Sequence, residues 1–231
     1  MGGMRHAREG KIMGSGVAER TDGTGLAGLD PDLDALMARV GPCGLGGGNG
    51  MTPYQALVRA IIGQQLHGKA AAAILARVQA LAGGAVPAPQ RMLDLPDEAL
   101  RGCGVSAAKL LAMRGVARAA LDGVVPDPAE AAALSDEDLI VRLTTLRGIG
   151  RWTVQMLLIF TLARRDVMPV DDFGVRAGWR RLKGLDAPPS PKRLAQATTG
   201  FAPHRSALAW YLWRAAEEGR TAATALTGSA S

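Results

Sequence analysis

The sequence predicts an all-α protein. Alanine and leucine are abundant, runs of β-branched residues are short, and charged residues recur at the spacing of helix faces. A chain of 231 residues is long enough to bury one core, or to form two small lobes that share a cleft. These observations favour helices packed on helices and leave the number of lobes open.

The charge balance favours a polyanionic partner. Lysine and arginine number 27 and aspartate and glutamate 21, which gives a formal net charge of +6. Many proteins are mildly basic without binding nucleic acid, so the charge alone leaves both interpretations open. Cys43 and Cys103 are too few for a four-cysteine iron–sulfur or zinc site, and we expect reduced thiols.

The apolar runs and the chain ends bear on location. No uninterrupted apolar run approaches the roughly 20 residues of a membrane span, and the N-terminal residues lack the apolar region of a secretory signal. We therefore expect a cytoplasmic protein without a membrane partner. Residues 1–25 predict a disordered basic tail, either an inert leader or a non-specific DNA contact, and residues 221–231 a frayed C-terminal tail.

Asp30 and Pro31 are predicted to open the first helix, which carries apolar residues along one side. The glycine-rich loop at 41–50 neither follows a strand nor precedes a Lys-Ser/Thr pair, which excludes a phosphate loop or a dinucleotide fingerprint. Thr52 and Pro53 then start the next helix as its N-cap and first residue.

A polar corner follows that helix in the segment 63–69. Gln64, Gln65, His67 and Lys69 interrupt the apolar pattern before a further helix continues to about residue 81. These side chains either reach into a nucleic-acid groove or lie in solvent at an ordinary corner between helices. Both interpretations stay open.

Two similar turns occur later in the chain. Residues 100–104 read LRGCG and precede a helix capped by Ser106, and residues 146–150 read LRGIG. An old duplication or a shared way of turning between helices explains the similarity, and we favour the second. Only the later turn has the spacing of a full hairpin of two helices.

The later turn predicts a phosphate-binding site. Ser135 caps a helix that leads to Gly148, and a second helix, apolar nearly all round, runs from residue 152 to about 164. Gly148 and Gly150 leave backbone N–H groups exposed at a helix start, where phosphate binds. A Gly-x-Gly turn with a purely structural role is also common.

An acidic pair, Asp171 and Asp172, follows Pro169 and begins a new helix. Capping is the common role of such an aspartate, but two consecutive acids exceed that need. A carboxylate in a cleft can stabilise an oxocarbenium-like sugar cation or orient water onto C1′, which is the chemistry of glycosidic bond cleavage.

Aromatic residues make up only 4% of the chain, yet several lie close to these features. Trp152 adjoins the hairpin, and Trp210, Tyr211 and Trp213 lie on the last predicted helix, from about residue 204 to 218. Core packing explains any one of them. As a group they can line a pocket for a flipped, cationic base, because aromatic faces attract cations.

The string LRGIGRWTVQMLLIF followed by MPVDDFG resembles the signature of the helix-hairpin-helix (HhH-GPD) DNA glycosylases, in particular the 3-methyladenine glycosylase II subgroup. The resemblance extends to LVRAIIGQQLHGKAA and FAPHRSALAWYLWR, and so covers most of residues 30–217. It implies a two-lobed all-α fold with the active-site cleft between the lobes and no N-terminal β-domain. One catalytic domain is expected at 26–220, with lobe 1 at about 65–165, its hairpin at 139–162, and lobe 2 at about 26–62 plus 168–220.

The resemblance also implies roles for individual residues. Asp172 matches the catalytic carboxylate, and Gln65 the wedge that fills the gap left by a flipped nucleotide. The implied base pocket contains Trp152, Met156 and Trp213. The implied DNA-binding residues are Gln64, Gln65, His67, Lys69, Gly148, Gly150, Arg151 and Thr153. The main-chain carbonyls that match a monovalent-cation site in relatives are those of Thr144, Leu146 and Ile149, so a structural Na+ or K+ is expected and no other cofactor is required.

Two departures from the wider family narrow the expected activity. Bifunctional members carry a lysine nucleophile just after the hairpin, where this chain has Trp152, and endonuclease III-like members carry a four-cysteine cluster that this chain lacks. The resemblance therefore implies a monomeric, monofunctional glycosylase, associated with the nucleoid, that removes alkylated purines from double-stranded DNA in base excision repair. The alternatives are a non-catalytic module that binds damaged DNA, and a glycosylase for oxidised or mismatched bases.

Overall fold

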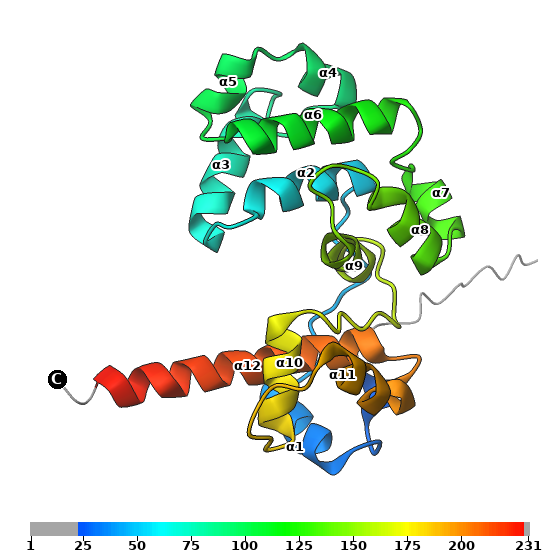
Figure 1. The fold of residues 1–231 in the computed structure, drawn as a ribbon, viewed down its shortest axis with the longest axis vertical. Coiled ribbons are helices and arrows are strands. Elements are labelled where there is room, and N and C mark those ends of the chain that lie inside the picture. The colour runs from blue at the N-terminus through cyan, green and yellow to red at the C-terminus, as the bar shows by residue number, and fades with distance from the viewer. Residues whose placement is uncertain (1–22, 229–231) are drawn as a thin grey trace, which may run out of the picture.

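The computed structural model describes residues 23–228. All regular elements in this part of the chain are helices, so the predicted all-α class is confirmed. Figure 1 shows two groups of helices, and α9 (Arg151–Phe160) is the helix of the first group that lies nearest the second. None of the helices in the described segment combines the length and the apolar character of a membrane span.

The first group, here called the hairpin lobe, carries the predicted corner and the hairpin. Its core includes Leu57 and Ile61 from α2 and Met113 from α6, all fully buried. α6 packs against both α2 and α4, and α2 in turn packs against α9 of the hairpin. The lobe consists of α2 (Pro53–Gly63), α3 (Gly68–Ala80), α4 (Pro89–Asp94), α5 (Asp97–Gly102), α6 (Ala107–Leu121), α7 (Pro128–Ala133), α8 (Asp136–Leu143) and α9.

The second group, here called the carboxylate lobe, carries the acidic pair. α10 and α12 cross at close range, since a Cβ built on Gly178 would lie 1.9 Å from the carbonyl oxygen of Leu212. Only glycine permits this approach. The lobe consists of α1 (Pro31–Val40), α10 (Phe173–Leu182), α11 (Pro191–Ala197) and α12 (Arg205–Gly228), with 3-10 turns at Thr24–Leu26 and Thr199–Phe201.

The helices begin where capping residues predict. Asp30 accepts hydrogen bonds from the backbone N–H groups of Asp32 and Leu33. Thr52 and Gln55 form a reciprocal capping box at α2. The hydroxyls of Ser106 and Ser135 cap α6 and α8 by accepting the backbone N–H of Lys109 and of Asp138.

The predicted lobe boundary is wrong for α2. The boundary assigns residues 26–62 to lobe 2, yet α2 packs against α3, α6 and α9 in the hairpin lobe. The reason is its apolar surface: Val58 and Ile62 are buried as well as Leu57 and Ile61, so α2 needs partners on more than one side.

Further differences concern short helices and chain ends. α4 and α7 were not expected because six residues are too few to show a helical period. α9 ends at Phe160 rather than near residue 164, and α12 continues to Gly228, so residues 221–228 of the predicted frayed tail are helical. Residues 1–22 of the predicted tail, which extends to residue 25, lie outside the described residues. Leu26, the first residue after the predicted tail, is fully buried.

Candidate active site

The carboxylate of Asp172 is the centre of the site. Asp172 is the N-cap of α10, and its Oδ1 accepts a hydrogen bond of 2.8 Å from the backbone N–H of Val175. Oδ1 also accepts from Trp213 Nε1 at 2.9 Å, and Oδ2 accepts from Trp152 Nε1 at 2.6 Å. Three donors from three helices therefore fix both oxygens, and charge-assisted bonds of this kind are the strong ones. The neighbouring Asp171 is exposed.

Trp213 reaches the carboxylate because a glycine leaves room for its indole. A Cβ on Gly174 would lie 2.9 Å from Cδ1 of Trp213 and 3.1 Å from Oδ1 of Asp172. The ring also stacks on Phe160, with 5.6 Å between centroids and 25° between planes. Phe160 thus joins the last turn of α9 to the indole that holds Asp172.

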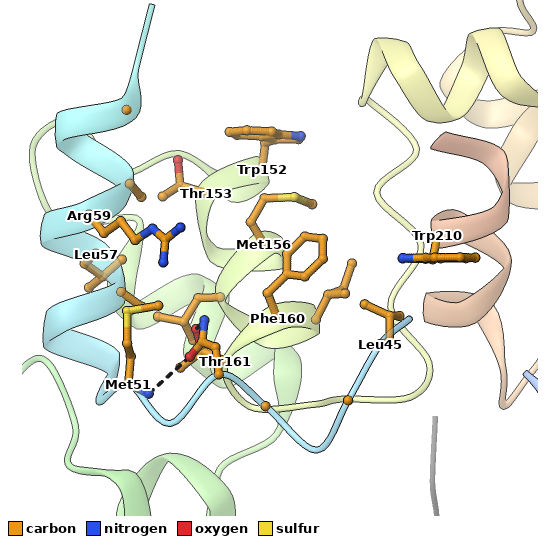
Figure 2. Close-up of a pocket in the computed structure, with 18 of the residues that line it drawn as sticks. Leu45, Met51, Leu57, Arg59, Trp152, Thr153, Met156, Phe160, Thr161 and Trp210 are labelled. Carbon is orange, nitrogen blue, oxygen red and sulfur yellow. Dashed lines mark hydrogen bonds between the residues drawn. The ribbon is translucent and has the colours of Figure 1, made fainter. Parts of the chain in front are cut away.

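A cavity of about 1020 Å³ adjoins this cluster through Trp152 and Phe160, which line it, whereas Asp172 itself is not a lining residue. Figure 2 shows Trp152, Met156 and Phe160 in succession along one face of α9, with Leu45 and Trp210 across from them. Arg59 extends from α2 toward the same space. Because these residues are mostly aromatic or apolar, the cavity suits a flat, polarisable ring such as a nucleobase.

The structure separates the two tryptophans that the sequence placed together in the base pocket. Trp152 and Met156 line the cavity, whereas Trp213 is not among its lining residues and instead donates to Asp172. α9 is also not buried all round, since Trp152 is 47% and Phe160 39% exposed on the cavity side. The spacing of Trp152, Met156 and Phe160, four residues apart each time, was the signal that could have identified this face.

The cation Arg214 on the cavity wall is paired. Its guanidinium forms an ion pair with Glu217 at 2.6 Å and lies 4.9 Å from the centroid of the Trp210 ring. Arg214 thus covers part of the Trp210 ring, whereas Arg59 is a second cation that lines the cavity.

The hairpin joins α8 to α9 through a turn that exposes its backbone. Gly148 has φ +82°, a conformation that favours glycine, and Ile149 packs into the core while its N–H donates to the carbonyl of Leu146 at 3.1 Å. Gly150 is the N-cap of α9 and provides no side-chain cap. The first N–H groups of α9 therefore keep their capacity for a phosphate, with the helix dipole adding to the attraction.

Of two predicted DNA-binding side chains beside the hairpin, one is paired and the other is buried. The guanidinium of Arg151 forms a two-bond ion pair with Glu137, at 3.0 and 2.8 Å. Thr153 is 6% exposed and lines the cavity, so its side chain is too buried to contact a duplex directly. Backbone groups, rather than these side chains, are the donors that the hairpin presents.

The polar corner lies between α2 and α3. The side chain of Gln64 donates to the carbonyl of Gly148 at 2.9 Å, which makes it a hairpin contact rather than a free DNA ligand. Gln65, His67 and Lys69 are exposed, and Gln65 lies at the border of the cavity.

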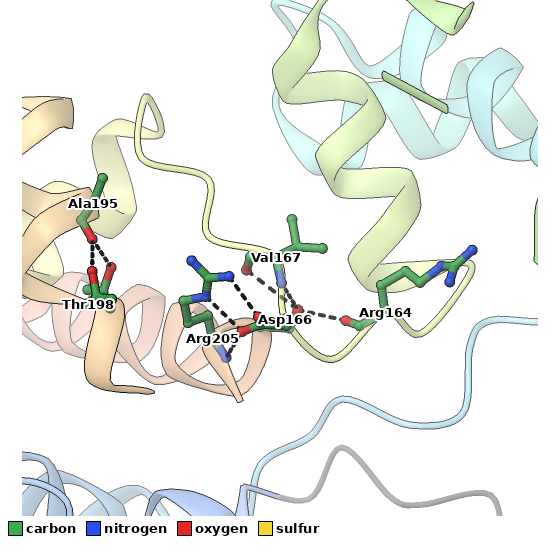
Figure 3. Close-up of polar contacts among 8 residues, drawn as sticks. Arg164, Asp166, Val167, Ala195, Thr198 and Arg205 are labelled. Carbon is green, nitrogen blue, oxygen red and sulfur yellow. Dashed lines mark hydrogen bonds and ion pairs between the residues drawn. The ribbon is translucent and has the colours of Figure 1, made fainter. Parts of the chain in front are cut away.

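The connection between α9 and α10 is anchored to the start of α12 (Figure 3). Arg205 forms a two-bond ion pair with Asp166, with both distances 2.7 Å, and its guanidinium lowers the pKa of that carboxyl. The hydroxyl of Ser206 donates to the carbonyl of Arg164 at 2.6 Å and accepts from the N–H of Val167 at 3.0 Å. This anchoring fixes the path of the chain that leads to Asp172.

The carbonyls of Thr144, Leu146 and Ile149 come from the turn itself. That of Leu146 already accepts the N–H of Ile149, which leaves it one lone pair. Carbonyl oxygens are hard donors and suit an alkali cation rather than a transition metal. Among the described residues, no group of three or more His, Cys, Asp or Glu side chains could hold a metal ion, and both cysteines are free thiols.

A family model described as "HhH-GPD superfamily base excision DNA repair protein" matches residues 58–204, a segment that contains the corner, the hairpin and Asp172. The chain belongs to this superfamily. The HhH-GPD match therefore covers both the backbone turn and the carboxylate whose geometry is given above.

Relatives of this HhH-GPD chain carry glycosylase names. It is 46% identical over 163 residues to DNA-3-methyladenine glycosylase 1 of Schizosaccharomyces pombe, which covers 70% of this chain and 72% of that protein. A solved 3-methyladenine DNA glycosylase of the same yeast, in complex with abasic DNA, superposes with TM-score 0.76 at 43% identity, over 82% of this chain and 93% of that one. A DNA-3-methyladenine glycosidase from Bacillus halodurans gives TM-score 0.75 at 34% identity, over 85% and 91%.

Proposed function

We propose that this protein is a monofunctional DNA glycosylase that excises alkylated purines from double-stranded DNA, as a step of base excision repair. The observation that carries the proposal is the Asp172 carboxylate, which three donors hold beside an aromatic cavity. The names of the relatives support the reaction, and the abasic DNA bound to the yeast enzyme supports DNA as the substrate.

Each part of the site has a step in this reaction. Backbone N–H groups of the hairpin hold a phosphate, and the damaged nucleotide rotates out of the duplex into the cavity. There the base stacks against the aromatic residues of α9, and a cationic alkylated purine gains from their π faces. The duplex gap left behind faces the polar corner that carries Gln65.

Bond cleavage then leaves positive charge on the sugar. The fixed carboxylate of Asp172 stabilises that charge at its developing position. Water adds its hydroxide part to C1′ and loses a proton to solvent, so the products are a free base and an abasic site. Alkylation at N3 or N7 makes the purine a cationic leaving group, and for this reason one carboxylate is sufficient.

Strand cleavage is not part of the proposed activity. Trp152 stands directly after the hairpin, where a lysine nucleophile would be needed for a Schiff base, and an indole cannot form one. Its N–H group is engaged with Asp172 instead.

We propose further that the hairpin carbonyls of Thr144, Leu146 and Ile149 bind Na+ or K+, which would strengthen the turn's attraction for phosphate. Loss of DNA affinity when K+ is replaced by tetramethylammonium at equal ionic strength is the check. The expected monomeric state and the cytoplasmic, nucleoid-associated location stay predictions.

The test of the proposal is base release from a set of duplexes that each carry one lesion, with strand cleavage scored separately. The set contains 3-methyladenine, 7-methylguanine, 1-methyladenine, ethenoadenine and hypoxanthine. Asp172→Asn is expected to abolish base release while keeping DNA binding, because the amide retains the shape but loses the charge. Asp171→Asn, an exposed neighbour, is the matched control and is expected to retain release. Full activity of Asp172→Asn would refute the assignment.

A further inference from the structure

The corner between α2 and α3 holds one residue in an unusual conformation. Gln65 has φ +57°, in the left-handed region that residues with a side chain avoid. A conformation of this kind persists only where the surroundings determine it. Since Gln65 is exposed at the border of the cavity, groups behind it must fix the backbone from which it projects.

An ammonium group from another helix holds the residues immediately before Gln65. Lys109 Nζ donates to the carbonyl of Ile62 and to the carbonyl of Gln64, at 2.8 Å each. These carbonyls belong to the C-terminal end of α2, where helix carbonyls lack intrahelical partners and the dipole favours a cation. Lys109 therefore caps α2 and restrains the backbone that leads into Gln65.

The position of Lys109 in its own helix is unfavourable for a positive charge. It lies in the first turn of α6, where the positive end of the dipole disfavours a cation. Burial lowers the pKa of its ammonium, which also works against the charged form. The two corner carbonyls are the contacts that favour the charge in this place.

A second connection runs from the same corner to the hairpin. Gln64, whose carbonyl accepts from Lys109, donates through its side-chain amide to the carbonyl of Gly148 at 2.9 Å. Lys109, Gln64 and Gly148 thus form a continuous chain of hydrogen bonds between α6, the corner and the phosphate-binding turn. The exposed Gln65 and the hairpin are held in one fixed relation.

We infer that Lys109 is a positioning residue that holds Gln65 in the conformation that enters the duplex and couples it to the hairpin. The inference rests on the proposed function and extends it to a residue that does not line the cavity. Lys109 acts on base extrusion through Gln65 and not on the cleavage of the glycosidic bond.

The experiment measures extrusion without requiring cleavage. Lys109→Met, similar in length but without a donor, is placed in the Asp172→Asn background and mixed with a duplex that carries 2-aminopurine beside the lesion. Fluorescence of 2-aminopurine rises when its neighbour leaves the stack. We expect Lys109→Met to reduce the extrusion signal about 10-fold, while affinity for undamaged DNA changes less than about 2-fold. Lys192→Met, which removes the same charge from an exposed site on α11, is the control.

A double-mutant cycle with Gln65→Ala separates positioning from a general loss of structure. If Lys109 acts through Gln65, Lys109→Met has less than about a 2-fold effect on extrusion once Gln65 is Ala. An equal loss in both backgrounds, or unchanged extrusion in folded Lys109→Met, overturns the inference. Where Lys109→Met melts below the assay temperature, all four proteins of the cycle are compared below its melting temperature.

The outcome is separable from that of the proposed function. A protein that releases none of the five lesions refutes the glycosylase proposal. One that releases a lesion normally, yet extrudes it equally well with Lys109→Met, refutes only the role of Lys109.

Discussion

The hairpin between α8 and α9 and the carboxylate cluster at the start of α10 are built in opposite ways. At the hairpin the functional groups are backbone N–H groups: Ile149 packs inward and Arg151 pairs with Glu137, while the side chain of Arg147 is exposed. At the cluster the functional groups are side chains, since Asp172 is held by the indoles of Trp152 and Trp213.

The two kinds of site are sensitive to different substitutions. A backbone site depends on the path of the chain, so its φ angles and glycines matter more than its exposed side chains. A side-chain site depends on single atoms, so removing one N–H group changes the chemistry while the fold persists. Substitutions can therefore affect either DNA binding or base release separately.

The largest effect is expected at the side-chain site. Trp152→Phe and Trp213→Phe each keep an aromatic ring but remove one donor to Asp172. A hydrogen bond to a charged group contributes roughly 1.5–3 kcal/mol, so we expect the single-turnover rate of base release to fall about 10- to 100-fold. Affinity for undamaged duplex, measured by fluorescence anisotropy, is expected to stay within about 2-fold. Equal losses of rate and affinity would erase the distinction between the two sites.

A smaller effect is expected at the backbone site. Gly148→Ala forces a side chain into a conformation with φ +82° and brings its Cβ to 3.3 Å from that of Ala112. We expect about 1–2 kcal/mol of lost stability, read as a lower melting temperature, and about 10-fold weaker duplex binding. Gly150→Ala is the comparison, because Gly150 has ordinary φ and no heavy atom within 4 Å of the added Cβ. If Gly150→Ala destabilises the fold as much as Gly148→Ala, backbone conformation is not the cause.

The smallest effect is expected in the connection between α9 and α10, where Asp166 pairs with Arg205. The Arg205 guanidinium lowers the pKa of Asp166, so the pair stabilises the fold above the unfolded pKa of about 3.9. That contribution is lost as pH falls through the lower, folded pKa. Arg205→Gln should therefore lower the melting temperature slightly at pH 7 and at pH 5, and the difference from wild type should shrink toward pH 3. A difference that grows on acidification would argue against the ion pair.

The hairpin and the acidic pair could be predicted because each is a local pattern. Gly148, Gly150 and Asp172 lie in segments whose neighbours in sequence are also their neighbours in space. The cap of Asp172 on Val175 follows from the three-residue spacing of any N-cap. Local patterns of this kind can be recognised in the sequence without knowing how the helices pack.

The hydrogen bond from Trp213 was not predictable in the same way. It depends on how α12 crosses α10, which is determined by the missing side chains of Gly174 and Gly178. The sequence therefore indicated the right residue but a different role. The assignment of α2 to lobe 2 is wrong for a related reason. α2 is apolar on more than one side, and its position depends on which other helices pack against those sides.

The hydrogen-bond donors to Asp172 come from different lobes. Val175 and Trp213 belong to the carboxylate lobe, whose α10 and α12 are locked at Gly178, whereas Trp152 comes from the helix that begins at the hairpin. Oδ1 is thus bonded within one lobe, and Oδ2 across the gap between two. If the lobes part by about an ångström, Oδ2 loses its donor while Oδ1 keeps both of its own. The hydrogen bond from Trp152 to Oδ2 therefore depends on the distance between the lobes. DNA that binds the hairpin and moves its lobe would change this bond, and so would affect the carboxylate that acts on the sugar.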